Sequence, residues 1–180
     1  MTEDIKAIWI KTGYEIFALE GQSDIKIERL AKKVGISKSS FYHLFADVDL
    51  FIEILLKHHI KQSHIIADKE QRAKNIDPEL INVLLEHKID LLFNRQLRIN
   101  QHVKSFSETL CTSNKIIGDA FKTAWAKDMN LKLNEQQTEG IFSLALQNFY
   151  LQINADNINY DWLSTYFINL KKIANSLIRE

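Results

Sequence analysis

The stretch LAKKVGISKSSFYHLF, residues 30–45, contains the signals for two short helices separated by a turn. Apolar residues before the turn follow the i, i+3, i+4, i+7 spacing of one helix face: Ile27, Leu30, Ala31 and Val34. Gly35 ends this helix well because glycine adopts positive φ at little cost, and Ser37 is a typical N-cap for the next helix. Two short helices joined by a brief turn that contains glycine form a helix-turn-helix pattern.

The second of these helices, which we expect to end near Phe45, carries two different faces. Phe41, Leu44 and Phe45 cluster on one side of a helical wheel and would face the core. The opposite arc holds side chains that folding does not require there: Ser39, Tyr42 and His43, with Lys38 and Ser40 at its edges. Side chains of these types hydrogen-bond to the phosphates and base edges of DNA.

Positive charge is concentrated at the same place. The chain has 23 basic and 23 acidic residues, so its formal net charge is zero and any surface for nucleic acid must be local. Five basic residues between positions 26 and 43 stand against the single acidic residue Glu28: Lys26, Arg29, Lys32, Lys33 and Lys38. A local cluster of this kind attracts the phosphate backbone. The predicted DNA-contacting residues are Lys26, Arg29, Lys38, Ser39, Ser40, Tyr42 and His43.

Residues 21–51 also resemble the DNA-binding region of the TetR family of transcriptional regulators. The resemblance is carried by Gly21, IERLAKKVGIS at 27–37, KSSFYHLF at 38–45 and Phe51, in the family's spacing without gaps. It implies an all-helical homodimer with an N-terminal DNA-binding domain and a variable C-terminal domain for ligand binding and dimerisation. It further implies that Tyr42 and His43 contact phosphates, whereas Lys38 and Ser39 reach base edges.

The chain departs from the family pattern at two places. Family members commonly carry Ser or Thr where this chain has Ile25 and Lys26, so we expect Asp24 or Ser23 to supply the missing helix cap. Many members also have a phosphate-contacting Lys where this chain has Val48. Loss of one phosphate contact lowers the salt dependence of DNA binding by about one unit.

The remaining sequence is helical in its periodicity, and five Gly and one Pro favour helix over sheet. A first helix is expected to close near Gly21, and a long helix capped by Asp47 is expected to fade near residues 72–75. Pro78, preceded by Asp77 as the cap, would begin the next helix. The helices expected from there lie near 78–97, 101–112, 114–130, 135–154 and 159–178, punctuated by asparagines.

This pattern predicts an all-α protein of about nine helices. We expect a DNA-binding domain at 1–46, joined by the long helix to an effector-binding and dimerisation domain at 47–180. Apolar residues of the last helix repeat at 4, 3, 4, 3 spacing, which predicts a homodimer interface together with Tyr166: Leu163, Phe167, Leu170, Ala174 and Leu177. A monomer that buries these faces in its own core is the alternative.

An effector pocket is expected among the helices at 78–154. Its candidate lining residues are Phe93, His102, Phe106, Phe121, Trp125, Phe142 and Phe149. This lining favours a largely apolar or aromatic small molecule over a phosphorylated one. Aromatic residues at helical spacing are, however, also ordinary core residues, so the pocket could be filled.

Other chemistry has little support in the sequence. Cys111 is the only cysteine and is expected to be buried, and His58, His59 and His64 are expected to be solvated helix residues, so we predict neither a metal site nor a cofactor. No H-E-x-x-H, phosphate-binding glycine loop or G-x-S-x-G motif occurs, so we predict no enzyme. The acidic N-terminus is unlike a signal peptide, and no long apolar stretch is present, so we expect a cytoplasmic protein without membrane contact.

We therefore expect a homodimeric, ligand-responsive transcriptional repressor that binds a double-stranded DNA operator. Paired recognition helices would read half-sites about 34–36 Å apart, and ligand binding would change their separation. One alternative is a protein-binding adaptor of the same fold without DNA binding, against which the Lys32, Lys33, Lys38 and Tyr42 cluster argues. A helical enzyme is the second alternative, and the absence of catalytic motifs argues against it.

Overall fold

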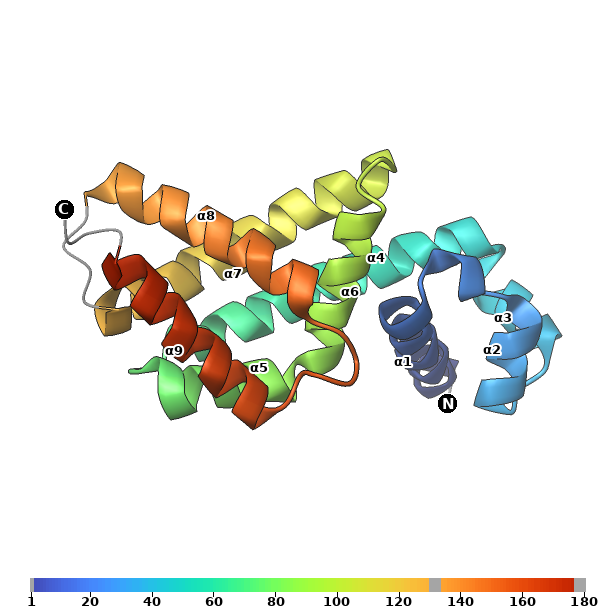
Figure 1. Cartoon of the computed structure of the whole chain (residues 1–180). Coiled ribbons are helices and arrows are strands. Elements are labelled where there is room, and N and C mark those ends of the chain that lie inside the picture. The colour runs from blue at the N-terminus through green and yellow to red at the C-terminus, as the bar shows by residue number, and fades with distance from the viewer. Residues whose placement is uncertain (1, 130–133, 177–180) are drawn as a thin grey trace. The chain divides into compact units, whose positions relative to one another are not determined.

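The computed structural model describes residues 2–129 and 134–176, and these residues form helices and no strands (Figure 1). Nine α-helices occur in this part of the chain, which confirms the all-α prediction. The first elements are α1 (Thr2–Glu20), η1 (Gln22–Asp24), α2 (Ile27–Val34), α3 (Lys38–Phe45) and α4 (Val48–Glu70). They are followed by η2 (Ile76–Leu80), α5 (Ile81–Glu86), α6 (Lys88–Ile99), α7 (Lys104–Met129), α8 (Glu135–Gln152) and α9 (Tyr160–Ser176).

The chain packs into two compact units. The first comprises Met1–Gln62 and Ile89–Ser113, and the second comprises Ser63–Lys88 and Asn114–Glu180. Helices α4 and α7 each contribute residues to both units. This division by packing differs from the predicted functional division at residues 46 and 47, which stays a prediction.

Aromatic side chains hold the first unit together. The Phe51 ring of α4 packs edge-on against the rings of Phe41 and Phe45 of α3, at centroid distances of 5.1 and 4.8 Å. Trp9 of α1 lies edge-on to the Phe41 ring at a centroid distance of 5.4 Å and is fully buried. A Cβ on Gly13 would lie 2.5 Å from the Phe51 ring, so α1 and α4 approach closely only because residue 13 lacks a side chain.

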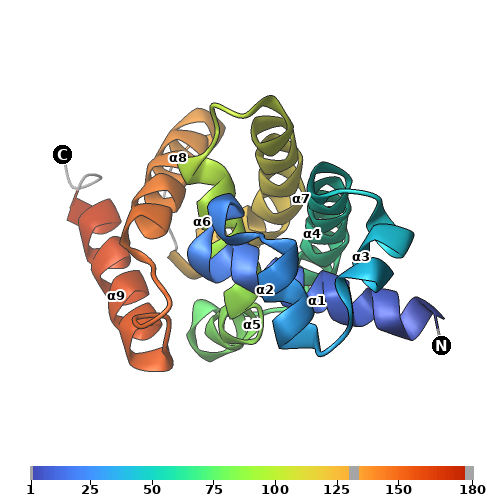
Figure 2. The same ribbon diagram turned by 90° about the vertical axis from the view of Figure 1, so that its right-hand side faces the viewer.

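Short-range signals in the chain set where the N-terminal helices begin and end. Gly21, at φ 95°, ends α1 as predicted, and its N–H donates to the carbonyl of Phe17 at 2.9 Å. Asp47 caps α4 as predicted, because its carboxylate accepts a hydrogen bond of 2.8 Å from the N–H of Leu50. Helix α1 packs against α2, and α2 packs against α3, as Figure 2 shows from a second side.

In the second unit, α7, α8 and α9 share an aromatic core. Trp125 of α7 is fully buried and lies 5.6 Å from the Phe142 ring of α8, while Phe121 contacts both Phe142 and Phe167 of α9. Helix α9 also packs against α5 (Figure 1). Asn134, one of the asparagines between the expected helices, caps α8 in a reciprocal capping box with Gln137.

Three predicted boundaries are wrong. The helix expected at 78–97 is broken at His87, which has φ −101° and ψ 26°, so α5 and α6 are separate. Conversely, the helices expected at 101–112 and 114–130 are one helix, α7, with Asn114 inside it. One asparagine lowers helix propensity by less than about 1 kcal/mol, which packing along a long helix readily offsets.

The third error concerns the cap near Pro78. Asp77 has an extended backbone, as is usual before proline, and the N-cap is Asn75, whose side chain accepts from the N–H of Glu79 at 3.2 Å. The Asp77 carboxylate instead accepts hydrogen bonds from the hydroxyls of Ser164, at 2.6 Å, and Tyr160, both of α9. These two hydrogen bonds lower the pKa of Asp77.

Glu70, at the end of α4, is fully buried, and neither carboxylate oxygen has a hydrogen-bond partner among the described residues. Burial raises the pKa of this carboxyl well above its usual value. Because the folded state then holds its proton more tightly than the unfolded state, stability is greatest below the unfolded pKa and falls as pH rises through the folded one.

We predict that Glu70→Gln removes this part of the pH dependence. Relative to the wild type, the variant should gain stability between pH 4.5 and pH 8, because it has no buried carboxyl group that must lose its proton over this range. Thermal or urea unfolding at the two pH values measures the gain. Glu53→Gln, an exposed position on the same helix, is the control. An equal pH slope in Glu70→Gln and wild type would contradict the prediction.

Candidate nucleic-acid interface

The candidate interface is built on α2, the turn at residues 35–37 and α3. Gly35 has the left-handed conformation, φ 74° and ψ 22°, and its N–H donates to the carbonyl of Ala31 at 2.9 Å. The chain reverses here without strain because glycine has no Cβ. Ser37 occupies the N-cap position of α3 in an extended conformation, but its side chain forms no capping hydrogen bond.

The core-facing side of the pair is as predicted. Leu30 and Phe41 are completely buried, and Phe45 is nearly so. Contacts of Phe41 and Phe45 with Phe51 fix the rotation of α3 about its axis. The remaining arc of α3 must therefore face outward.

That outward arc holds most of the predicted DNA-contacting residues. Lys38, Ser39 and His43 are exposed on α3, and Tyr42 keeps 54% of its surface accessible although it is aromatic; Lys26, the N-cap of α2, is exposed as well. Ser40 is half-buried. An exposed tyrosine beside a lysine and serines offers both hydrogen-bond donors and a positive charge to a ligand outside the protein.

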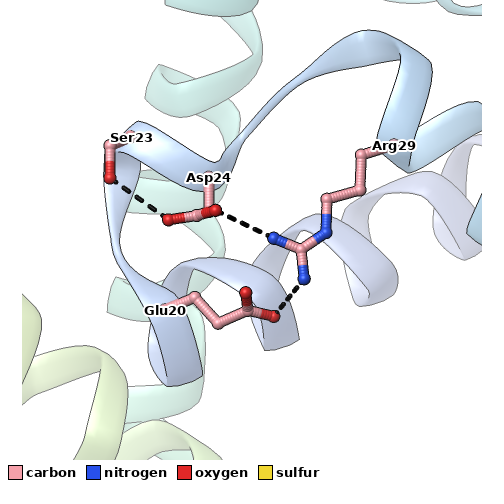
Figure 3. Close-up of polar contacts among 4 residues, drawn as sticks. All are labelled: Glu20, Ser23, Asp24 and Arg29. Carbon is pink, nitrogen blue, oxygen red and sulfur yellow. Dashed lines mark hydrogen bonds and ion pairs between the residues drawn. The ribbon is translucent and has the colours of Figure 1, made fainter.

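Arg29 differs from the other predicted residues, because its guanidinium is engaged within the protein. Figure 3 shows it donating to the carboxylates of Asp24, at 3.0 Å, and Glu20, at 2.5 Å. The hydrogen bond to Glu20 is the main reason that the pKa of Arg29 is raised. Ser23 also donates to Asp24 at 3.2 Å. Arg29 thus ties the end of α1 and the η1 segment to α2.

The same network accounts for the start of α2, where the expected side-chain cap is missing. The N-cap residue Lys26 forms no side-chain capping hydrogen bond. Asp24 and Ser23, which we expected to substitute, bond to Arg29 and to each other instead. The carboxylate of Asp24 therefore stabilises α2 through an ion pair rather than as a cap.

The local positive charge is smaller than the sequence window suggested. Lys38 forms an ion pair of 3.1 Å with Glu28, and both side chains are well exposed. Once Glu20 and Asp24 are included, residues 20–43 hold five basic and three acidic residues, a net charge of +2. Lys26, Lys32 and Lys33 are exposed and form no ion pair within the described part of the chain. Lys32 and Lys33, although counted in the charge, were not among the predicted contacts.

The predicted effector pocket is divided between the two units. Phe93 and Phe106 are buried in the first unit, where both rings pack against Phe17, and His102 is exposed. The others belong to the second unit: Phe121, Trp125, Phe142 and Phe149. Phe142 and Phe149 are each 6% exposed. Neither the cleft along α8 and α9 nor the cleft beside α1, both described below, is lined by any of the seven residues.

The predicted dimer residues lie on two different faces of α9. Leu163, Phe167 and Ala174 are buried inside the protomer, so the 4, 3, 4, 3 stripe packs mainly within the chain. Tyr166 and Leu170 are half-buried and line a cleft with exposed neighbours. Leu177 lies outside the described residues.

Two other side chains differ from expectation. His59, expected to be solvated, is fully buried, and Cys111, expected to be buried, is exposed. The signal for His59 was present, because it follows Ile52, Leu55 and Leu56 on one face of α4. Within the described residues, no group of three or more His, Cys, Asp or Glu could hold a metal ion, and no helix is long and apolar enough to cross a membrane.

Comparison with known proteins adds no family assignment. No protein-family model matches the chain, and a search of curated proteins finds no match. Any function must therefore be inferred from the residues and their arrangement.

We predict that Arg29 matters more for stability than the other basic residues nearby. Arg29→Gln should lower the free energy of unfolding by more than Lys33→Gln does, because two partly exposed ion pairs are lost together. Lys33→Gln, at an exposed site that forms no ion pair with the described residues, should change it by less than about 0.5 kcal/mol. Urea unfolding compares the two variants. Equal, negligible effects would show that the Arg29 ion pairs contribute nothing.

Proposed function

We propose that this protein is a sequence-specific, double-stranded-DNA-binding transcriptional regulator that acts as a homodimer, a ligand-responsive repressor. The observation that carries the proposal is the outward arc of α3, with Lys38, Ser39, Tyr42 and His43 exposed beside the Gly35 turn. The resemblance of residues 21–51 to the TetR family supports it, since the matching positions include the same exposed residues.

In the proposed complex, the N-terminal end of α3 enters the major groove. Lys38 and Ser39 lie at this end of α3 and would contact base edges. Tyr42 and His43 would contact phosphates beside the groove. Lys26, Lys32 and Lys33, which form no ion pair with the residues that the structure describes, supply positive charge nearby. Because exposed ion pairs contribute only about 0–1 kcal/mol, Lys38 can leave Glu28 for DNA at little cost.

The proposed dimer uses α8 and the outer side of α9. Leu144 and Leu151 of α8 are 70% and 80% exposed, and Ile173 of α9 is 58% exposed, which is unusual for large apolar side chains. Between the two helices, Trp162, Tyr166 and Ile173 help to line a cleft of about 250 Å³. Two such helix pairs related by a two-fold axis would form a four-helix bundle that covers these side chains.

The proposed effector of this regulator is a small, largely apolar molecule. Its binding would change the separation of the two recognition helices and hence the fit to the operator. Helix α4 is the natural connection, since it begins directly after α3 and contributes residues to both units.

An adaptor without DNA binding is the second candidate, and the ion pairs of Arg29 and Lys38 favour it. They reduce the charge available to phosphates in the region of the turn. The two candidates differ in whether the purified protein binds DNA at all.

We predict saturable binding to DNA that flanks the protein's own gene, weaker at high salt than at low salt. Lys38→Ala and Tyr42→Ala should each weaken binding by about 1–2 kcal/mol, roughly 5–30-fold, because each removes a direct contact. Fluorescence anisotropy at two salt concentrations measures both effects.

The controls for this experiment are Lys57→Ala, an exposed lysine on α4, and Tyr42→Phe, which removes only the hydroxyl. Lys57→Ala should bind as the wild type does. If folded protein fails to bind both these fragments and DNA selected from a random pool, the adaptor replaces the regulator as the proposed function.

For the dimer, we predict that Leu151→Asp and Ile173→Asp convert the protein to monomers at micromolar concentration, because each buries a charge in an apolar interface. Ile65→Asp is the matched control, since Ile65 is 45% exposed on α4 and outside the proposed interface. Sedimentation equilibrium distinguishes the species. A wild-type protein that is monomeric at every concentration would rule out the dimer.

A further inference from the structure

The first unit contains a buried polar network that the proposed DNA-binding surface does not use. It joins Tyr14 of α1, His59 of α4, Asp90 and Asn94 of α6, and Ser113 of α7. His59 and Ser113 are fully buried, Asn94 is 2% exposed, and Asp90 is 8% exposed. Polar groups at such depth are costly unless they are hydrogen-bonded, so the network constrains how these helices pack.

Each hydrogen bond of this network is donated toward Asp90. A carboxylate only accepts, so the Tyr14 hydroxyl donates to Asp90 at 2.8 Å. Having used its single proton, Tyr14 must accept from Nδ1–H of His59 at 2.7 Å. His59 Nε2 then accepts from Ser113 at 3.2 Å, and Asn94 donates to Ser113 at 3.2 Å. Burial lowers the pKa of His59 to about 4, which agrees with the neutral ring that this pattern requires.

Asp90 therefore provides a negative charge whose position is fixed. Tyr14 holds the carboxylate, and Tyr14 is itself held by a neutral histidine and by stacking on the Phe93 ring at 4.3 Å. A carboxylate that is almost buried and already oriented loses little further freedom when it binds a ligand.

A cleft of about 490 Å³ opens over this carboxylate, within the first unit between α1, α4 and the start of α6. Its apolar lining includes Ala7, Ile10 and Ile89, and Tyr14 and Asp90 also line it. The volume lies in the range of small-molecule sites, about 300–1,000 Å³. The cleft therefore combines apolar walls with one buried, oriented charge.

The other titratable groups that line the cleft leave this charge in place. Lys11 is exposed and Glu15 is half-buried, so one charge of each sign also lines the cleft. Burial lowers the pKa of His58, which favours the neutral imidazole. Among the described residues of the lining, Asp90 is thus the only charged group that is more than nine-tenths buried, and it sets the sign of the ligand.

We infer that this cleft binds a small organic cation, a protonated amine with an apolar body. The ammonium group would pair with Asp90, and the apolar body would lie against Ile10 and Ile89. A free anion would be repelled by Asp90, and a neutral molecule would gain only the apolar contacts. This ligand chemistry differs from that of the effector in the proposed function, and the site requires no DNA.

The test uses the full chain and benzylammonium as the probe, with benzyl alcohol and phenylacetate as matched neutral and anionic probes. In a ¹⁵N-labelled protein, benzylammonium should shift the amide signals of Ala7, Ile10 and Ile89 in a saturable manner. Benzyl alcohol and phenylacetate should bind at least about tenfold more weakly, a difference of about 1.4 kcal/mol.

Two variants locate the site. Asp90→Asn should weaken benzylammonium binding about tenfold or more, because it removes the charge. Ala7→Trp, at an exposed position of the lining, should fill the cleft and abolish binding without disturbing the network. Ala155→Trp, at an exposed alanine of the second unit, is the matched control and should bind normally. No saturable binding, equal binding of the three probes, or undiminished binding in Ala7→Trp would overturn the inference.

Discussion

The close approach of α1 to α4 at Gly13 is the constraint on which the first unit depends. Residue 13 has no side chain, and the Phe51 ring lies where one would be. A Cβ on this residue would be only 2.5 Å from carbons of the Phe51 ring. The same ring contacts Phe41 and Phe45 and so fixes the rotation of α3. Which residues of α3 face outward is therefore decided by packing on its opposite side.

Basic residues in this region serve two purposes that compete for the same charges. Arg29 joins α1, η1 and α2 through two carboxylates, and this use of its guanidinium reduces the charge that remains for phosphates. Lys38 is different, because its ion pair with Glu28 is solvent-exposed and weak. The proposed DNA surface thus relies on exposed lysines and on Tyr42, which the packing of α3 leaves facing outward.

Apolar surface is divided in a comparable way on α9. One stripe, which contains Leu163, Phe167 and Ala174, completes the core of the second unit. The neighbouring stripe, which contains Trp162, Tyr166 and Ile173, is left at the surface next to α8. A helix that is apolar on both stripes has more apolar surface than one protomer can bury, which is the basis of the proposed dimer.

The helical fold, the Gly35 turn, the Asp47 cap and the two faces of α3 could be predicted from the sequence, because periodicity and caps act over a few residues. Tertiary structure alone decided that Arg29 pairs with Glu20, that one stripe of α9 is buried, and that Tyr14, His59 and Asp90 form one network. It also decided the continuity of α7 through Asn114 and the break at His87. The physical reason is distance along the chain, since Tyr14 and Asp90 are 76 residues apart and no local pattern records which side chains will meet.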